Sequence, residues 1–248
     1  MISLADLAPT LWALAVLILI TVLVLRVSRS EDFVAPAVAI LRGAAQLALI
    51  SLVLGGIITS PVWVGVALLV MFTVAAGTAT RRLAWSWRRF IAVATTMAAG
   101  IVVTLAVVFG TGAIEFTPRY VLAVGGIVIG NSMTIAVLSG RRFFEAVHEQ
   151  WHEVEGWLAL GATGRQATLA QARQSVHAAL IPSTDQTKTT GLVTLPGAFV
   201  GAIFGGASPL EAGRFQVVVL ASILAAGAIT AVALIHTFGA VKVRPDVL

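Results

Sequence analysis

The chain has 248 residues, of which 58% are hydrophobic and 11% are charged, with a mean hydropathy of +0.99 and a formal net charge of +5. A soluble domain carries about 25% charged residues, so the composition excludes that class and points to a protein that uses lipid as its solvent. The absence of cysteine excludes disulfides, cysteine-based zinc sites, iron–sulfur clusters and thiol catalysis.

Seven apolar stretches predict transmembrane helices. They are continuously apolar rather than alternating, which excludes a β-barrel, and most have the ~17–25 residues that a hydrocarbon core requires. The sixth is shorter and is interrupted by Pro196. The fold class is therefore all-α, a polytopic membrane protein with a single transmembrane domain over residues 1–248. The predicted spans are residues 7–25, 35–58, 62–80, 90–110, 120–138, 192–206 and 215–238.

The basic residues predict which way these spans face. The first span has Asp6 before it and Arg26 and Arg29 after it, which is the wrong polarity for a cleaved signal peptide. We therefore expect the N-terminus outside and the C-terminus in the cytoplasm of a cell membrane, with no nucleic-acid partner. Thirteen of the 16 Lys and Arg residues fall on the predicted cytoplasmic side, as the positive-inside rule requires. They are Arg26, Arg29, Arg81, Arg82, Arg88, Arg89, Arg141, Arg142, Arg165, Arg173, Lys188, Lys242 and Arg244.

One long polar segment, residues 141–190, separates the fifth and sixth spans. Apolar residues from Phe143 to Leu158 recur at helical spacing, which predicts an amphipathic helix that ends near Gly161. A second polar helix is expected from Arg165 to Leu180, with Pro182 ending it. The segment is nearly neutral, whereas a helix that lies on anionic lipid is basic. This favours a cytoplasmic hairpin that docks a protein partner, and a solvated hairpin with no partner is the alternative.

The sequence contains one pattern typical of metal chemistry and none for ATP hydrolysis by a P-loop. The only lysines, Lys188 and Lys242, follow Thr187 and Val241, so the chain has no P-loop. The sequence His148-Glu149-Gln-Trp-His152 matches the H-E-x-x-H pattern of zinc metalloproteases, in which two histidines bind zinc and the glutamate activates water. Glu153, Glu155 and His177 are candidate third ligands, but none has a persuasive spacing. We expect a solvated helix face here, with no catalytic residue, metal site or cofactor.

Polar residues inside the predicted spans are candidates for a substrate pathway, because an isolated ionisable group in hydrocarbon costs roughly 3 kcal/mol or more. Arg42 lies in the second span with Gln46 one turn further, and Asn131 and Ser132 interrupt the fifth. Snorkelling explains Arg42 equally well, and helix–helix hydrogen bonding explains the polar pair of the fifth span. Pro196 and Gly197 suggest a broken sixth helix whose freed carbonyls line a pathway.

Several of these stretches together resemble the FetB-type permeases. The resemblance rests on Arg42-Gly-Ala-Ala-Gln46-Leu, Gly130-Asn-Ser-Met133 and the stretch from Thr189 to Gly197. These permeases are membrane subunits of a small ABC transporter group that includes bacterial iron exporters and plant aluminium-tolerance proteins. Where some members carry Pro-Gly-Met-Met-Thr-Gly-Gln, this chain has Pro196-Gly-Ala-Phe-Val-Gly-Ala202 and lacks those polar side chains.

The resemblance implies a homodimer of permeases working with a separate ATP-binding subunit, and metal-ion export, with iron as the family's substrate. The spacing from Glu155 to Gly161 is similar to the coupling loop of ABC importers. Six residues are therefore expected to couple the chain to the ATPase: Trp151, Glu155, Trp157, Gly161, Asp185 and Lys188. The rival functions are a secondary transporter or channel without an ATPase, and a membrane zinc metalloprotease.

Overall fold

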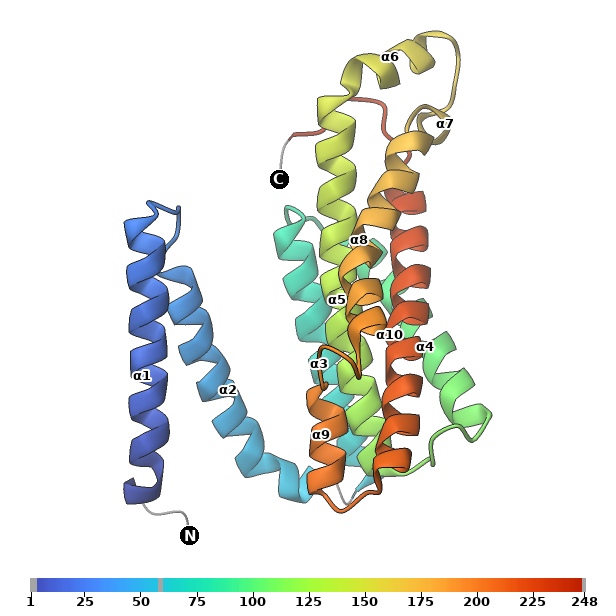
Figure 1. Cartoon of the computed structure of the whole chain (residues 1–248). Coiled ribbons are helices and arrows are strands. Elements are labelled where there is room, and N and C mark those ends of the chain that lie inside the picture. The colour runs from blue at the N-terminus through green and yellow to red at the C-terminus, as the bar shows by residue number, and fades with distance from the viewer. Residues whose placement is uncertain (1–3, 58–59, 247–248) are drawn as a thin grey trace. The chain divides into compact units, whose positions relative to one another are not determined.

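Helices account for all the secondary-structure elements in the part of the chain that the structure describes. A computed structural model of the protein describes residues 4–57 and 60–246 (Figure 1). The chain divides into two units, unit 1 (Met1–Ile57) and unit 2 (Ile58–Leu248).

Unit 1 is a pair of antiparallel helices, α1 (Leu4–Val27) and α2 (Ala35–Ile57). The turn between them contains two residues with positive φ, Arg29 at 52° and Asp32 at 54°. The predicted spans 7–25 and 35–58 correspond to these helices, except that Ile58 lies outside the described residues.

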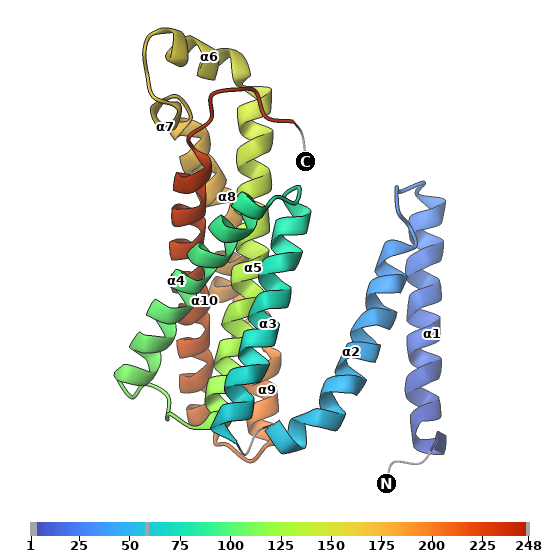
Figure 2. The same cartoon turned by 180° about the vertical axis from the view of Figure 1, so that it is seen from behind.

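Unit 2 is built around four long apolar helices: α3 (Pro61–Arg82), α4 (Trp87–Gly110), α5 (Pro118–Glu149) and α10 (Pro209–Phe238). Both α4 and α5 pack along α10, and α3 packs along α5 (Figures 1 and 2). Three of the four begin with proline, whose missing N–H is not needed in the first turn of a helix. Fully buried side chains from all four fill the centre, among them Ala79, Val93, Met97, Val124, Val128 and Leu234.

α4 and α10 approach each other closely at Gly100. A Cβ atom added there would lie 2.6 Å from the Ala226 carbonyl oxygen and 2.7 Å from Thr230 Oγ1. Glycine therefore allows two backbones to pack more tightly than any larger residue would, which is the usual role of small residues between membrane helices.

A helical cap covers one end of unit 2. It consists of the last turns of α5, then α6 (Trp151–Ala159), α7 (Gly164–Ala167) and the C-terminal tail, residues 239–246. A second apolar cluster holds it together, with Phe143, Val147 and Val154 fully buried. The expected amphipathic helix from Phe143 to Leu158 is thus wrong as one element, because the chain bends at Gln150 and divides it between α5 and α6.

The remaining two helices, α8 (Leu169–Thr189) and α9 (Gly197–Phe204), follow one another from the cap end of unit 2 towards the opposite end (Figure 1). α8 packs on α5 and α10, and α9 packs on α10. Two expectations are wrong here. Pro182 does not end its helix, which continues to Thr189, and residues 192–206 do not form one span, because only Gly197–Phe204 is helical.

Six described helices are long and apolar enough to cross a membrane: α1, α2, α3, α4, α5 and α10. The expected all-α membrane fold is confirmed. The predicted span over residues 192–206 is not among the six, because it contains only the eight-residue α9.

Candidate functional site

An irregular backbone segment interrupts the chain between α8 and α9. Gly191 has φ of +87°, a conformation that glycine adopts without steric cost. Its N–H donates to the Thr194 carbonyl oxygen over 2.8 Å, and the Val193 N–H donates to that of Thr189 over 2.9 Å. Pro196 then precedes the first turn of α9 as its N-cap, without a side-chain cap, and Gly197 begins the helix. The predicted break at these two residues is therefore present, and it lies directly after a polar helix.

The depth of that polar helix follows from its neighbours. Arg141 Nε donates to the Arg82 carbonyl oxygen over 3.3 Å, so Arg141 of α5 lies level with the basic end of α3. Basic residues at the ends of apolar helices mark the membrane surface. Deeper along α5, the Ile135 side chain meets Leu180 of α8 beside Gly227.

From that contact α8 continues away from the cap, antiparallel to α5 (Figure 1). Asp185 comes five residues after Leu180, and Ile135 comes six residues before Arg141. At 1.5 Å per residue these eleven residues span about 16 Å, so Asp185 lies about that far from the Arg141 level, near the middle of a ~30 Å hydrocarbon core. The sequence analysis counted Asp185 and Lys188 among the coupling residues. In the structure they lie four to five turns along α8 from the cap.

Asp185 and Lys188 contact each other. Lys188 Nζ donates to Asp185 Oδ1 over 3.1 Å, and the two side chains are 59% and 69% exposed. Both residues are exposed within unit 2, so this face of α8 is accessible there.

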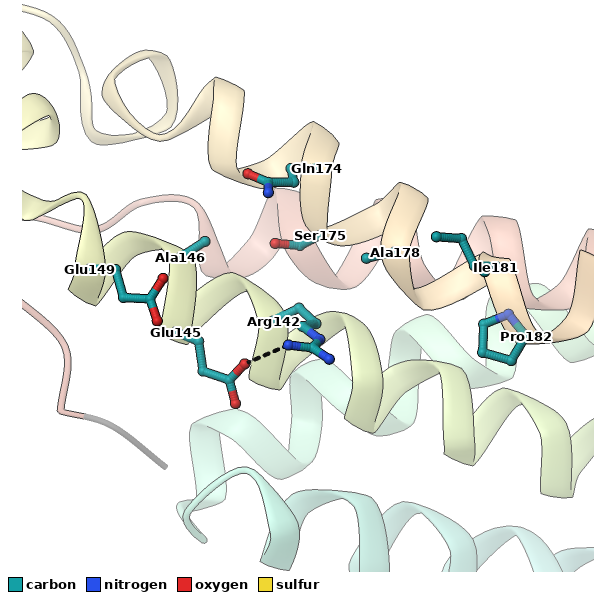
Figure 3. Close-up of a pocket in the computed structure, with 9 residues that line it drawn as sticks. All are labelled: Arg142, Glu145, Ala146, Glu149, Gln174, Ser175, Ala178, Ile181 and Pro182. Atoms are coloured by element: carbon teal, nitrogen blue, oxygen red, sulfur yellow. Dashed lines mark hydrogen bonds and ion pairs between the residues drawn. The ribbon is translucent and has the colours of Figure 1, made fainter.

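A pocket of about 410 Å³ lies between α5 and α8 on the cap side of this pair (Figure 3). It is lined by Arg142, Glu145, Ala146, Glu149, Gln174, Ser175, Ala178, Ile181 and Pro182. Arg142 Nη1 pairs with Glu145 Oε2 at 3.4 Å. Because proline has no N–H, Pro182 leaves the Ala178 carbonyl without its intrahelical bond. The pocket thus runs from charged residues above the Arg141 level to within one turn of Asp185.

The polar residues of α5 differ in accessibility. Asn131 is half-buried and its Nδ2 donates to the Ile127 carbonyl oxygen over 2.9 Å. Ser132 is 1% exposed, and its hydroxyl oxygen has no hydrogen-bond partner among the described residues. Asn131 is about level with Asp185, whereas Ser132 faces the packed interior of the unit.

Arg42 and Gln46 belong to unit 1. Both lie on α2, one turn apart, and both are exposed within that unit. Their side chains are thus available to a partner helix or to water.

The cap separates the predicted docking residues into two groups. Trp151 is half-buried in the apolar cluster of the cap, so it supports α6 from within. Trp157 is 52% exposed, Leu160 is 82% exposed, and Glu155 is exposed with them. Leu160 was missed by the sequence analysis, although an apolar residue one turn from Trp157 was the available signal.

The end of α6 is fixed by a glycine C-cap. Gly161 has φ of +90°, its N–H donates to the Leu158 carbonyl, and the Ala162 N–H donates to that of Trp157. This is the hydrogen-bond pattern of a Schellman motif, which needs a left-handed residue at the position of Gly161. The glycine therefore reverses the chain after the exposed face of α6 and holds Trp157 and Leu160 outward.

The C-terminal tail contacts His148, the first histidine of the H-E-x-x-H pattern. His148 Nδ1 lies 2.8 Å from the Pro245 carbonyl oxygen, and His148 Nε2 lies 3.2 Å from Arg244 Nη2. The helix also breaks at Gln150, so His148 and His152 belong to different helices. The described residues contain no group of three or more potential metal ligands. The H-E-x-x-H pattern therefore lacks the single helix face that a zinc protease needs.

The six long apolar helices define the class as a polytopic α-helical membrane protein. The model of the family described as "Uncharacterised protein family (UPF0014)" matches residues 8–241, and the chain belongs to this family.

Three relatives show the range of the family. The chain is 42% identical over 196 residues to "UPF0014 membrane protein STAR2" of Oryza sativa subsp. japonica, covering 78% of this chain and 69% of that one. It is 37% identical over 170 residues to "Protein ALUMINUM SENSITIVE 3" of Arabidopsis thaliana, covering 68% and 62%. It is 37% identical over 160 residues to "Probable iron export permease protein FetB" of Escherichia coli (strain K12), covering 64% and 61%.

In the last two comparisons the match spans less than two thirds of the relative's length. No solved structure matches the chain. The resemblance to FetB-type permeases, expected from the sequence, is confirmed.

Proposed function

We propose that the chain is the membrane permease of an ATP-driven transporter and that a separate subunit hydrolyses the ATP. The main support for this proposal is the cap. At its α6 end Trp157 and Leu160 are exposed to solvent, while Val154 of α6 is buried in the apolar cluster of the cap. A tryptophan and a leucine held outward on a rigid helix are typical of a surface that fits an apolar groove of a partner. Since the chain has no P-loop of its own, an ATPase is the partner that would supply energy.

The direction and assembly of the complex are part of the same proposal. The cap end carries the basic residues at the ends of α3, α4 and α5, which supports a cytoplasmic cap and C-terminus and an N-terminus outside. Lys188, which the sequence analysis counted among the cytoplasmic basic residues, is placed within the membrane in this proposal, because it lies beside Asp185 on α8. Two permease copies per complex are expected, with the open face of α8 and α9 available to the second copy.

We propose that the transporter moves metal ions and that it moves them out of the cell. A relative that is 37% identical bears the name of an iron export permease. The pathway residues in this proposal are Arg42, Gln46, Asn131, Pro196 and Gly197, together with the Asp185–Lys188 pair. Ser132 keeps a structural role, because its side chain is buried.

The test is capture of the tagged chain from its native membrane, with identification of the co-purifying proteins by mass. The proposal predicts recovery of a P-loop ATPase with the wild-type chain and its loss with Trp157→Glu. Trp63→Glu is the matched control, because Trp63 is 57% exposed and lies at the opposite end of unit 2 from the cap.

Trp151→Glu is unsuitable for this test, because a charge there would disrupt the cap itself. Capture of the chain alone, combined with solute movement in liposomes without ATP, would replace the proposal with a secondary transporter or channel.

A further inference from the structure

The turn between α3 and α4 concentrates positive charge at the cap end of unit 2. Four of the nine residues from 81 to 89 are arginines: Arg81, Arg82, Arg88 and Arg89. A fifth, Arg141 of α5, joins them, because its Nε atom donates to the Arg82 carbonyl oxygen over 3.3 Å. The sequence has no aspartate or glutamate between residues 33 and 114. The turn therefore carries no negative charge of its own.

Arg89 gives the turn its shape. Its Nη1 atom donates to the carbonyl oxygens of Leu83 and Ala84, over 2.6 and 2.8 Å, and its guanidinium lies 5.2 Å from the centre of the Phe144 ring of α5. Ala84 has φ of 56°, which is uncommon for a residue with a Cβ atom. Leu83 is fully buried beside Gly140 of α5. The turn is thus held against α5 in a defined conformation.

The other four arginines, which we call the arginine cluster, are available to a ligand. Arg81, Arg82 and Arg88 are exposed, and their side chains form no hydrogen bond or ion pair with any residue that the structure describes. Arg141 is exposed as well, and of its side chain only Nε has a partner among the described residues. Glu145, the acidic residue nearest to it along α5, is already in an ion pair within that helix. Four guanidinium groups at one end of a unit repel one another unless an anion neutralises them.

The position of the turn favours the membrane surface over a soluble partner. Trp85 and Trp87 are 55% and 66% exposed, and both rings lie against Phe90, at 5.6 and 5.4 Å between ring centres. Exposed tryptophans beside basic residues are typical of the level at which lipid headgroups lie. The cap extends further, since α5 continues for eight residues, about 12 Å, from Arg141 to Glu149 before α6 begins (Figure 2). A soluble protein that binds the cap therefore meets α6 first, whereas lipid headgroups lie at the level of the turn.

Arginine also determines which lipid fits. The planar guanidinium group pairs with two oxygens of one phosphate at once. A zwitterionic headgroup carries an ammonium group that offsets its phosphate, whereas an anionic headgroup keeps a net negative charge and is attracted to basic residues at the membrane surface. The arginine cluster, which has no counter-charge within the turn, therefore selects the anionic headgroup.

We propose that the arginine cluster binds the phosphate groups of anionic phospholipids on the cap side of the membrane, while Trp85 and Trp87 anchor the turn beside them. This site adds a lipid ligand to the proposed transporter and depends neither on the ATPase nor on the transported substrate. Bound lipid holds α3, α4 and α5 at the membrane surface and leaves the exposed face of α6 accessible to a partner.

The test is lipid binding by the purified full-length chain, counted by native mass spectrometry during titration with dioleoyl phosphatidylglycerol and, separately, with dioleoyl phosphatidylcholine. The wild-type chain is expected to bind the anionic lipid at least about 25-fold more tightly than the zwitterionic one. Arg81→Gln with Arg88→Gln is expected to reduce this preference by about 25-fold, at about fivefold for each arginine near the lipid phosphates. Binding of phosphatidylcholine should stay unchanged.

Arg26→Gln with Arg29→Gln is the matched control. It removes the same charge from the basic end of another apolar helix, α1, where Glu31 and Asp32 follow directly and no tryptophan occurs between residues 13 and 62. The control is expected to keep the lipid preference of the wild-type chain. Thermal unfolding of each variant shows that it is folded.

Tryptophan fluorescence locates the bound lipid. Phosphatidylglycerol brominated in its acyl chains is expected to quench the wild-type chain more than equally brominated phosphatidylcholine does. Trp85→Phe with Trp87→Phe keeps an aromatic ring at both positions and should remove this excess quenching. Excess quenching that persists in this variant would overturn the inference, because it would place the lipid elsewhere.

Three further results would overturn the inference. The first is equal binding of the two lipids by the folded wild-type chain, and the second is an equal loss of preference in the two double-arginine variants. The third is displacement of bound phosphatidylglycerol by inorganic phosphate, which would assign the cluster to a soluble phosphate. Loss of the ATPase in Arg81→Gln with Arg88→Gln, with lipid binding unchanged, would likewise assign the turn to the protein partner.

Discussion

Replacing Gly100 by alanine tests the packing on which unit 2 depends. The new Cβ atom would lie 2.6 Å from the Ala226 carbonyl oxygen, and that oxygen belongs to the backbone of a long helix, which cannot turn aside as a side chain can. An ordinary carbon–oxygen contact is about 3.4 Å or more, so α4 and α10 must separate by close to 1 Å along their interface.

The cost has two parts of opposite sign. Overpacking of a well-filled core destabilises a protein by about 1–3 kcal/mol, while alanine is about 1 kcal/mol better than glycine inside a helix. Gly100→Ala is thus expected to lower the free energy of unfolding by up to about 2 kcal/mol. For a unit of this size that corresponds to a fall in Tm of several degrees, at about 2–4 °C per kcal/mol.

The assay is thermal unfolding of the detergent-solubilised chain, followed by the loss of the monodisperse peak in size-exclusion chromatography. Gly130→Ala is the control, because Gly130 lies in the middle of α5 with no atom within 4 Å of its added Cβ. The control is expected to unfold at the wild-type Tm or above it. Equal Tm values for the two variants would refute the close approach of α4 and α10.

Three further changes test other parts of the account. Gly164→Ala would place a Cβ against the backbone of the C-terminal tail, so hydrogen exchange of residues 240–246 should accelerate, whereas Gly156→Ala, with open space around it, should leave the tail protected. Equal exchange in both would contradict the docking of the tail. Ser208→Ala removes the capping box of α10 and should cost about 1 kcal/mol in the same unfolding assay; an unchanged Tm would show that the cap is not needed. The purified chain should hold far less than one zinc per molecule, and His148→Ala with His152→Ala should leave transport unchanged; stoichiometric zinc would restore the metalloprotease hypothesis.

The sequence predicted the apolar helices well because lipid imposes a simple constraint on composition. Continuous apolar stretches of sufficient length recovered α1, α2, α3, α4, α5 and α10 to within a few residues at most ends. The largest difference is at α5, which was expected to end at Leu138. Arg141 and Arg142 mark the membrane surface, but the helix continues to Glu149 because Phe143 and Val147 pack into the cap.

α8 could not be predicted in the same way. Its second half is polar, and Pro182 is a common helix terminator, so local rules favour a cytoplasmic segment that stops there. Tertiary packing decides otherwise. Gln171, Ser175 and Ala179, spaced four residues apart, form a buried stripe against neighbouring helices, and this stripe of small and polar residues was the signal available in the sequence.

The candidate sites also differ in whether local sequence or tertiary packing determines them. The exposed Trp157 and the glycine turn at Gly161 follow from local pattern and could be read from the sequence. The depth of Asp185 depends on the register between α8 and α5, which a contact distant in sequence establishes, between Leu180 and Ile135. No local pattern carries that information.

Transport by the reconstituted complex tests the central claim most directly. The chain is placed in liposomes with its co-purifying ATPase, and metal-ion movement is followed with and without ATP. The account predicts movement that requires both ATP and the ATPase and that is lost in Trp157→Glu but kept in Trp63→Glu. Equal movement by the chain alone, without ATP, would contradict it.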